Sequence, residues 1–267
     1  MIDKTAIISP DAKIGANVEI GPYAIIGEHV ELGDNVKIGA HAHVEFAKIG
    51  AGAVVSPFAS IGGLPQDLGY KNELTGVEIG EGTQIREFCT INRASGEGNV
   101  TKVGARCLLM AYTHVAHNCV LEDEVIMANA ATIGGHTHVG RGAFLGGMSV
   151  FHQNLRVGEM AIVSGASAAR LDIPPYVKAE GMPALPMGIN AIGLRRRNIS
   201  KADRDALHTA IRILKSEQFN TTQALEEIEK TVTMNEYVVK LVEFIRTSKR
   251  GVALKSSKNF VQSESEE

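Results

Sequence analysis

The sequence predicts an all-β solenoid, a left-handed parallel β-helix of hexapeptide repeats, followed by a small C-terminal α-helical domain. The first observation is a period of six, because every sixth residue from Val103 to Val163 is a medium or large apolar one. The second is that glycine often follows the apolar residue, as in Ile14-Gly15. The third is that the period becomes helical after Ser200. Neither an amphipathic helix nor an alternating strand repeats every six residues, whereas each hexad of a β-helix supplies one short strand and one corner.

The coil is expected to span residues 1–190. The same period of six runs from Ile8 to Val44, shifts in phase by one residue, and continues from Ile49. Three hexads make one triangular turn, so eighteen residues advance the coil by roughly 4.8 Å. Two Gly-rich and polar stretches, at about 62–76 and 93–101, interrupt the pattern without losing its phase. We expect both to be loops that leave the coil, and loops on a rigid scaffold often carry function.

Residues 191–254 are predicted to form the helical domain. Ser200 can cap a first helix, with Asp203 in its first turn. A second helix fits residues 222–232, and a third fits residues 236–247 with one apolar stripe. The polar tail, residues 255–267, is predicted to be disordered.

Composition excludes several classes of protein. The net charge of −3 gives no general reason to expect nucleic acid, and no segment approaches the roughly 20 apolar residues of a transmembrane helix. The first fifteen residues lack the long apolar run of a signal peptide, so a cytoplasmic location is expected. The three cysteines, Cys89, Cys107 and Cys119, form no CxxC motif and are predicted to be small buried thiols.

Histidines gather where the repeat predicts a single corner. Five of the nine histidines lie between His114 and His152. Counting eighteen residues per turn, the residues that stack in three successive layers are His117, the Gly135-His136 pair and the His152-Gln153 pair. Imidazole titrates near neutrality and is the usual general base for a hydroxyl, which favours acid–base chemistry on a substrate lying along this edge. Because Gly135 has no side chain, its backbone N–H can approach a developing oxyanion closely.

Other interpretations of the histidines stay open at this point. They could be polar corner residues without chemistry, or they could bind zinc at an interface between subunits. A zinc-dependent hydratase built on a β-helix is the corresponding enzyme, and stoichiometric metal in the purified protein would favour it. A third hypothesis, that the protein is a purely structural β-helix, does not explain the stacked histidines or the two loops.

Several motifs occur in the order typical of one enzyme family. They are PQDLGY (65–70), TKVG (101–104), HVAHNC (114–119), ANAATIGGH (128–136), GGMSVFHQ (146–153), PPYVKAEG (174–181) and GINAIGLRRR (188–197). In these motifs the chain resembles the acyl-carrier-protein–UDP-N-acetylglucosamine O-acyltransferases, which begin lipid A synthesis. The resemblance covers the whole coil and the start of the helical region. It is more specific than hexapeptide periodicity, which unrelated enzymes share.

The resemblance implies an activity and a role for individual residues. The chain would transfer an (R)-3-hydroxyacyl group from acyl carrier protein to the glucosamine 3-hydroxyl of UDP-N-acetylglucosamine, with no cofactor and no metal. His117 matches the family's catalytic base, and Gly135 matches the residue whose N–H is assigned to the oxyanion. The residues that match substrate-holding positions are Gln66, Asp67, His114, His136, His152, Gln153, Gly165, Asn190 and Arg196. Among these, Asn190 and Arg196 match the nucleotide side, and Gly165 matches the far end of the acyl groove.

The resemblance also implies a homotrimer with active sites between subunits. This fits the sequence, because the Asp67 loop and the His117 corner need not meet within one chain. The basic run Arg195–Arg197 would suit docking of the acidic carrier protein, although an ordinary solvated basic patch explains it equally well. A variant of the same chemistry, with the 3-amino analogue of the sugar nucleotide as acceptor, fits the motifs too.

Two positions depart from the family's pattern. Asn118 follows the base where some relatives have Asp, so a charged His–Asp pair is not available. Gly69 stands where relatives often have Lys, so a substrate contact made by that lysine is lost or moved to Lys71.

Overall fold

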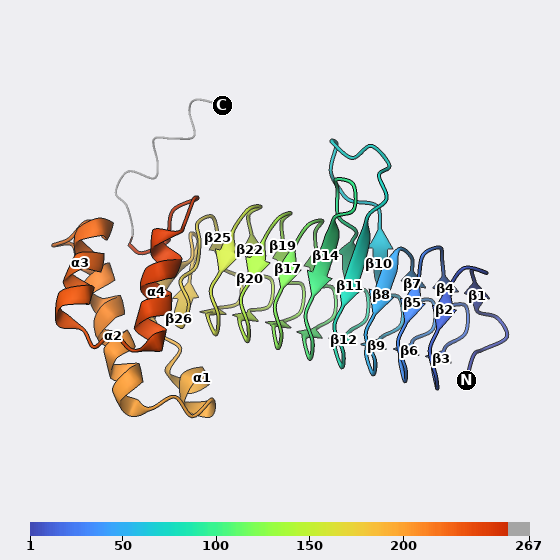
Figure 1. The fold of residues 1–267 in the computed structure, drawn as a ribbon, viewed down its shortest axis with the longest axis horizontal. Coiled ribbons are helices and arrows are strands. Elements are labelled where there is room, and N and C mark those ends of the chain that lie inside the picture. The colour runs from blue at the N-terminus through green and yellow to red at the C-terminus, as the bar shows by residue number, and fades with distance from the viewer. Residues whose placement is uncertain (256–267) are drawn as a thin grey trace.

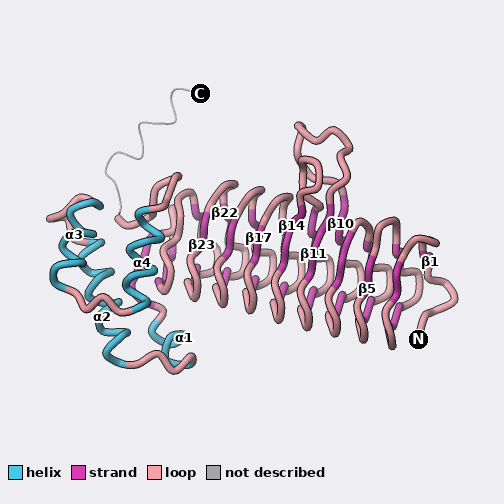
Figure 2. Tube along the Cα trace, viewed as in Figure 1, coloured by secondary structure: helices cyan, strands magenta, loops and turns pink. Residues whose placement is uncertain are grey.

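The computed structural model describes residues 1–255, so the predicted disorder of the tail concerns residues that lie almost entirely outside the described part. The chain passes through three sheets in rotation, and neighbouring strands of a sheet come from successive turns (Figures 1 and 2). All pairings are parallel except that of the last two strands. The parallel strands of a hexapeptide repeat, predicted from the period of six, are therefore present.

The sheets are named here in the order in which the chain first enters them. Sheet I contains β1 (Ile7–Ile8), β4 (Ile25–Ile26), β7 (His43–Val44), β10 (Ser60–Gly63), β13 (Thr90–Asn92), β16 (His114–Val115), β19 (Thr132–Ile133), β22 (Val150–Phe151) and β25 (Ala168–Ala169). Sheet II contains β2 (Lys13–Ile14), β5 (Glu31–Leu32), β8 (Ala47–Ile49), β11 (Gly76–Ile79), β14 (Val100–Val103), β17 (Val120–Leu121), β20 (His138–Val139) and β23 (Arg156–Val157). Sheet III contains β3 (Glu19–Ile20), β6 (Lys37–Ile38), β9 (Val54–Val55), β12 (Gln84–Ile85), β15 (Leu108–Leu109), β18 (Ile126–Met127), β21 (Phe144–Leu145), β24 (Ile162–Val163), β26 (Val177–Glu180) and β27 (Leu185–Ile189).

The repeat of six follows from what each position of a hexad does. The apolar residue points inward and is buried, so that Leu109, Met127 and Leu145 of successive turns fill the same column of the core. Where no loop intervenes and the phase of the repeat is unbroken, paired residues are eighteen apart, as in His114↔Thr132. Across the one-residue slip the spacing is seventeen, as in Leu32↔Ile49. The glycine after the strand lies directly on the next turn, since a Cβ on Gly146 would come within 2.4 Å of the backbone nitrogen of Gly165. A side chain at that position would therefore separate the two turns.

Both interruptions of the pattern leave the coil between sheets I and II. One runs from β10 to β11 and the other from β13 to β14, in consecutive turns, and they project side by side (Figure 1). Backbone hydrogen bonds join them, from the Gly76 N–H to the Asn99 oxygen (3.2 Å) and from the Gly98 N–H to the Leu74 oxygen (3.0 Å). The two loops therefore form one projection on one edge of the coil.

Four helices follow the last strand within the described part of the chain: α1 (Ala191–Arg196), α2 (Lys201–Lys215), α3 (Thr221–Thr231) and α4 (Glu236–Arg246). The three predicted helices are present with ends within one residue of the prediction where both ends were given, and Ser200 caps α2 as expected. Helix α1 was not predicted, because six residues are too few to show a helical period. The division into two domains at residue 190 stays a prediction, although the elements change from strands to helices at that point. No helix within residues 1–255 has the length and apolar character needed to cross a bilayer.

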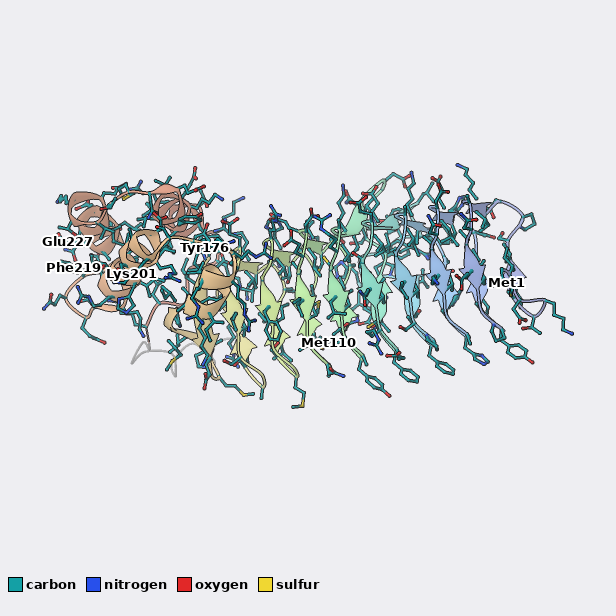
Figure 3. The ribbon with its side chains drawn as sticks, turned by 90° about the horizontal axis from the view of Figure 1, so that it is seen from below. Met1, Met110, Tyr176, Lys201, Phe219 and Glu227 are labelled. Atoms are coloured by element: carbon teal, nitrogen blue, oxygen red, sulfur yellow. The ribbon has the colours of Figure 1, made fainter. Side chains whose placement is uncertain are left out.

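Polar contacts fasten the helices to the end of the coil. Figure 3 shows Tyr176 at the junction, where its hydroxyl hydrogen-bonds Glu159. The ammonium group of Lys240 on α4 lies 3.0 Å from the same carboxylate. Arg156 of β23 donates to the Phe244 carbonyl oxygen (2.7 Å) and pairs with Asp172 (3.0 Å). These contacts hold α4 against the last turns of the coil.

Candidate active site

The predicted stack of histidines forms on the edge where the chain passes from sheet I to sheet II. We call residues 117, 135, 136, 152 and 153 the histidine corner. The His136 N–H donates to the His117 oxygen one turn below (3.1 Å), and the Asn154 N–H donates to the Gly135 oxygen (2.9 Å). The His117 and His136 rings are 5.2 Å apart at 88°, edge to face. The structure therefore brings together the corner residues that counting by eighteen predicts, next to the projecting loops.

The side chain of Asn118 determines which nitrogen of His117 carries the proton. Its Oδ1 accepts from the Ser95 backbone N–H (2.9 Å), and its Nδ2 donates to the Ser95 carbonyl oxygen (3.0 Å). These backbone groups have fixed roles, so the amide has only one orientation. Oδ1 then faces His117 Nδ1 at 2.8 Å and accepts a proton from it. In the neutral ring Nε2 is then the nitrogen without a proton, the tautomer that a general base requires.

Gly135 lies buried beneath the His117 ring. A Cβ at this residue would come within 2.7 Å of His117 Nε2, so the ring occupies its position only because residue 135 has no side chain. Among residues 1–255, no group accepts a hydrogen bond from the Gly135 N–H. This donor is therefore available for another acceptor, as an oxyanion role requires.

The first loop brings Asp67 to the histidine corner of the same chain. Hydrogen bonds from the Gly69 N–H and from the Ser95 side chain lower the pKa of the Asp67 carboxyl, and the nearby His117 and His136 lower it further. Nothing in the sequence required this loop and the corner to meet within one chain, but in the structure they do. Gln66 lies exposed beside Asp67. The Gly69 N–H donates to Asp67 Oδ1 (2.8 Å).

Two of the other histidines are neutral near pH 7. Burial lowers the pKa of His114, and the neighbouring His117 lowers it further. Burial also lowers the pKa of His136, with a smaller contribution from His117 that Asp67 opposes. His114 Nδ1 lies 2.8 Å from the Thr90 hydroxyl oxygen. Neutral rings of this kind offer hydrogen bonds to a substrate, not charge.

Two residues at this site were not predicted. Ser95, in the second loop, orients Asn118. Arg250, after the last helix, donates to Nδ1 of the exposed His152 at 2.9 Å. No motif or period marks either residue, and each reaches the corner from a segment distant in sequence. For Ser95, the only signal in the sequence was that a polar residue lies in a loop predicted to be functional. Arg250 had no such signal.

Three predicted substrate residues lie away from the histidine corner. Gly165 is on a different edge, between β24 and β25. Asn190 caps α1, accepting from the Gly193 N–H (2.9 Å) and donating to the Met160 oxygen (2.8 Å). Arg196 is exposed on α1, on the side of the coil opposite to the projecting loops (Figure 1). Within one chain these residues do not meet His117.

The basic run of α1 divides into two parts. Arg197 forms an ion pair with Glu124 on the coil (2.5 Å), and that carboxylate also binds Arg141 (2.6 Å). Arg195 and Arg196 are exposed. Only these two remain suited to an acidic partner.

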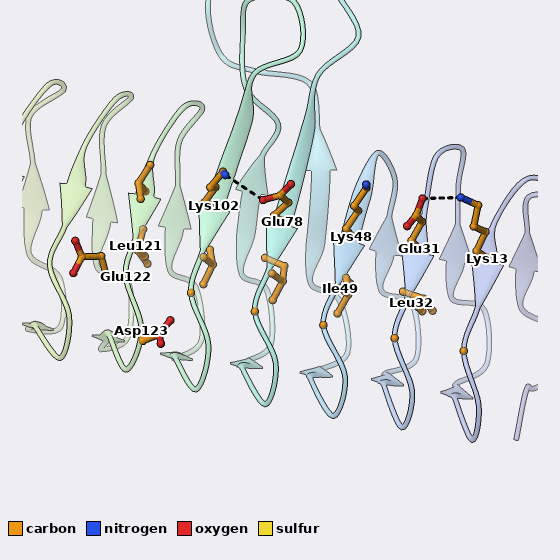
Figure 4. Close-up of a pocket in the computed structure, with 18 of the residues that line it drawn as sticks. Lys13, Glu31, Leu32, Lys48, Ile49, Glu78, Lys102, Leu121, Glu122 and Asp123 are labelled. Atoms are coloured by element: carbon orange, nitrogen blue, oxygen red, sulfur yellow. Dashed lines mark hydrogen bonds and ion pairs between the residues drawn. The ribbon is translucent and has the colours of Figure 1, made fainter.

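A groove of about 950 Å³ runs along sheet II (Figure 4), but none of the predicted site residues lines it. Its floor carries charges that alternate from strand to strand, and Lys13 pairs with Glu31 (2.8 Å) and Lys102 with Glu78 (3.3 Å). Pairs directly across neighbouring strands stabilise a sheet. Within residues 1–255, no three His, Cys, Asp or Glu side chains gather as the ligands of a metal ion would.

Comparison with known proteins gives the family. Residues 11–46 match the bacterial transferase hexapeptide (six repeats) model, and residues 172–253 match the second domain of UDP N-acetylglucosamine O-acyltransferase. The chain is 40% identical over 256 residues to the acyl-[acyl-carrier-protein]–UDP-N-acetylglucosamine O-acyltransferase of Campylobacter concisus, which covers 95% of this chain and 90% of the relative. The chain belongs to this O-acyltransferase family.

Other members of the O-acyltransferase family agree over nearly the full length. The enzyme of Thermodesulfovibrio yellowstonii is 41% identical over 253 residues, covering 94% of this chain and 98% of the relative. The crystal structure of the UDP-N-acetylglucosamine acyltransferase from Bacteroides fragilis superposes with a TM-score of 0.92 at 39% identity, covering 94% of this chain and 99% of that one. An O-acyltransferase needs a group that accepts a hydroxyl proton, and Nε2 of His117 is such a group.

Proposed function

We propose that this O-acyltransferase moves an (R)-3-hydroxyacyl group from acyl carrier protein to the glucosamine 3-hydroxyl of UDP-N-acetylglucosamine, the first step of lipid A biosynthesis. The names of its relatives support both substrates. The observation that carries the proposal for this chain is the hydrogen-bond chain from Ser95 through Asn118 to His117. It selects the tautomer of the neutral His117 ring in which Nε2 is free to accept a proton from a hydroxyl.

The reaction then proceeds by general-base catalysis. His117 Nε2 takes the proton of the sugar hydroxyl while that oxygen attacks the thioester carbonyl. Negative charge develops on the carbonyl oxygen, and the Gly135 N–H stabilises it. The new ester C–O bond remains, the C–S bond breaks, and the proton held by His117 passes to the departing thiol. The charge on the imidazolium is met by the amide oxygen of Asn118 instead of a carboxylate on the adjacent residue, with Asp67 as the nearby negative group.

The other predicted residues are proposed to hold the substrates. Those that the histidine corner and its loop present are Gln66, Asp67, His114, His136, His152 and Gln153. Asn190 and Arg196 are assigned to the nucleotide and Gly165 to the far end of the acyl chain. No cofactor takes part, because the acyl thioester is itself the activated co-substrate.

A homotrimer with composite sites is part of the proposal. Gly165 lies on another edge of the coil, and Arg196 lies on α1, on the side opposite to the projecting loops, so a second copy is needed to bring these residues to one substrate. Closed rotational symmetry then produces equivalent sites. The exposed Arg195, Arg196 and Lys201 form the proposed docking surface for the acidic carrier protein.

Two finer statements belong to the same proposal. We assign a left-handed hand to the coil, supported by the match to the hexapeptide family and by a residue of positive φ at most corners, for example Asn118, His136 and Asn154. A crystal structure phased from anomalous scattering would show the hand directly. A cytoplasmic location is supported by the three cysteines, which are all free thiols.

A transfer assay read by mass spectrometry tests the function. Purified protein is offered UDP-N-acetylglucosamine and a panel of 3-hydroxyacyl carrier proteins, with the 3-amino analogue in parallel. The expected product is O-acylated UDP-N-acetylglucosamine, and product from the amino analogue alone would move the acceptor to nitrogen. No product from either acceptor, with trimers intact, would contradict the proposal.

The base assignment has a matched control. His117→Ala is expected to lower kcat by a factor of about 10² to 10⁴, the usual contribution of a general base. His138→Ala removes an imidazole from the outer face of β20, where it pairs with Glu122 (3.1 Å), and is expected to retain activity. Near-normal turnover by the His117 variant would remove the assignment.

A further inference from the structure

The chain returns to the coil after its last helix. Residues 248–253, here called the C-terminal strap, lie along the last turn and are fastened on both sides of Arg250. The Ser248 hydroxyl donates to Asp172 Oδ2 (2.8 Å), and the Asp172 N–H donates to the Gly251 oxygen (3.0 Å). The Ala253 N–H in turn donates to the Asp172 oxygen (3.1 Å). Asp172 is only 1% exposed, so the strap is held by a buried residue and Arg250 has a defined position.

The guanidinium of Arg250 contacts the histidine corner directly. Its Nε donates to the Arg170 carbonyl oxygen (3.0 Å), and its Nη2 lies 2.9 Å from His152 Nδ1. Arg170 stands next to His152 in the following turn, since the strands before them pair Phe151 with Ala169. One side chain therefore links two consecutive turns at the end of the corner.

This contact determines the tautomer of His152. A guanidinium can only donate, so Nδ1 must accept and the ring proton must be on Nε2. The Gln153 oxygen, 3.3 Å from the same Nδ1, would require the opposite tautomer. The arginine contact is shorter and has a charged donor, so it determines the tautomer of His152.

We propose that Arg250 is a positioning residue for the sugar nucleotide. It holds His152 as a neutral Nε2–H donor, directed to an acceptor oxygen of UDP-N-acetylglucosamine. The inference rests on the proposed function for the identity of that ligand. Along one corner, His117 then accepts a proton at Nε2 while His152, two turns away or roughly 10 Å, donates one. His117 is prepared for its task by Asn118, which Ser95 of the second loop orients, and His152 by Arg250 of the C-terminal strap.

Substrate affinity, measured by calorimetry without acyl donor, tests the proposal independently of transfer. Arg250→Ala is expected to raise the Kd for UDP-N-acetylglucosamine about tenfold, and KM with it, while kcat is kept. Arg250→Lys retains a donor and is expected to recover part of the loss. Lys249→Ala removes the same charge from the adjacent exposed residue and is expected to change neither constant. An unchanged Kd in Arg250→Ala would overturn the proposal.

A double-mutant cycle separates positioning from other roles. If Arg250 acts through His152, the Arg250→Ala change is expected to cost nothing further in a His152→Ala background. Additive losses would mean that Arg250 contacts the ligand itself or only stabilises the fold, and would overturn the proposal. The ¹⁵N spectrum of His152 is expected to show an unprotonated Nδ1 in the unaltered protein and a mixture of tautomers in Arg250→Ala. Failure of the transfer assay with these affinity changes intact would instead contradict the proposed function.

Discussion

Two adjacent glycines at the histidine corner differ in what surrounds them. A Cβ on Gly134 would meet the backbone nitrogen of Gln153 at 2.7 Å, whereas a Cβ on Gly135 would meet the imidazole of His117 at the same distance. Backbone in a stacked turn cannot move aside without separating the turns, but a side chain can rotate. Gly134 therefore serves the fold, and Gly135 serves the position of the proposed base.

The pair yields a prediction with its own control. Gly135→Ala is expected to displace the His117 ring and lower kcat roughly 10- to 100-fold, part of what a general base supplies, with the melting temperature kept. Gly134→Ala is expected to lower the free energy of unfolding by about 1–3 kcal/mol, as overpacking does. Steady-state kinetics and thermal denaturation of both variants check this. Equal losses of stability in the two would contradict the distinction.

The cysteines permit a second prediction at this scale. Burial raises the pKa of Cys107 to about 11 and that of Cys119 to about 12, and it also raises the pKa of Cys89. Because the thiolate is the reactive form, none of the three is expected to react with Ellman's reagent in the folded protein at about pH 8. All three are expected to react in denaturant. A fast-reacting thiol in the native protein would show that one of them is accessible.

Counting along the repeat was enough to predict which residues share the histidine corner, but not the tautomers of its rings. The first follows from a period that holds from Val103 to Val163. The second depends on Ser95 and Arg250, which reach the corner from a loop and from beyond the last helix. Such contacts depend on the path of irregular segments, which no local pattern specifies.

Among the elements, the first projecting loop depends on one buried arginine. Arg93 donates to the Gly62 oxygen (2.9 Å) where the loop begins and to the Tyr70 hydroxyl (3.4 Å) within it. Its guanidinium also lies 4.1 Å from the centre of the Phe46 ring and 3.4 Å from the Glu45 carboxylate. This loop carries Gln66 and Asp67. Arg93 therefore orders two proposed substrate-binding residues without contacting the substrate itself.

Limited proteolysis measures how strongly Arg93 holds the first projecting loop in place. Arg93→Met keeps most of the side-chain volume but removes the donors, so trypsin is expected to cleave after the exposed Lys71 several times faster. KM for UDP-N-acetylglucosamine is expected to rise as the loop loosens. Arg86→Met, which breaks only an exposed pair with Glu87, is the control and is expected to leave the cleavage rate unchanged. Equal rates in all three proteins would show that the loop does not depend on Arg93.

The predictability of the elements follows from their length and regularity. The strands and the three longer helices have periods that the sequence displays, and the helix ends agree because Ser200, Asn220 and Asn235 cap them. Helix α1 and the C-terminal strap are short and are determined by contacts with the coil. Asn190, for example, caps α1 while its amide also binds the Met160 oxygen.

At the level of the whole molecule, the proposed residues are distributed over different edges. The corner with His117 faces the projecting loops, whereas α1 with Arg196 lies on the opposite side (Figure 1). A site that needs both must combine two chains.

Mixed trimers test this arrangement. His117→Ala and Arg196→Ala chains, each impaired alone at low UDP-N-acetylglucosamine, are expected to regain activity when assembled together. Random mixing leaves roughly a quarter of composite sites with both residues intact. Activity is compared before and after co-refolding the two variants. No recovery in trimers of confirmed mixed composition would place both residues in a site within one chain.

The eighteen-residue turn has a consequence for how such a gene can change in length. Removing one whole turn ahead of the loops would return every later strand to its own sheet. Removing the single hexad that contains β15, between the loops and His117, would instead move each later strand to the neighbouring sheet and rotate all later corners by one third of a turn. The histidines would still be present in the sequence, but they would face another edge, away from the loop that carries Asp67. Changes in the length of the coil therefore preserve the site when they comprise whole turns, whereas the loops can change in length without moving a strand to another sheet.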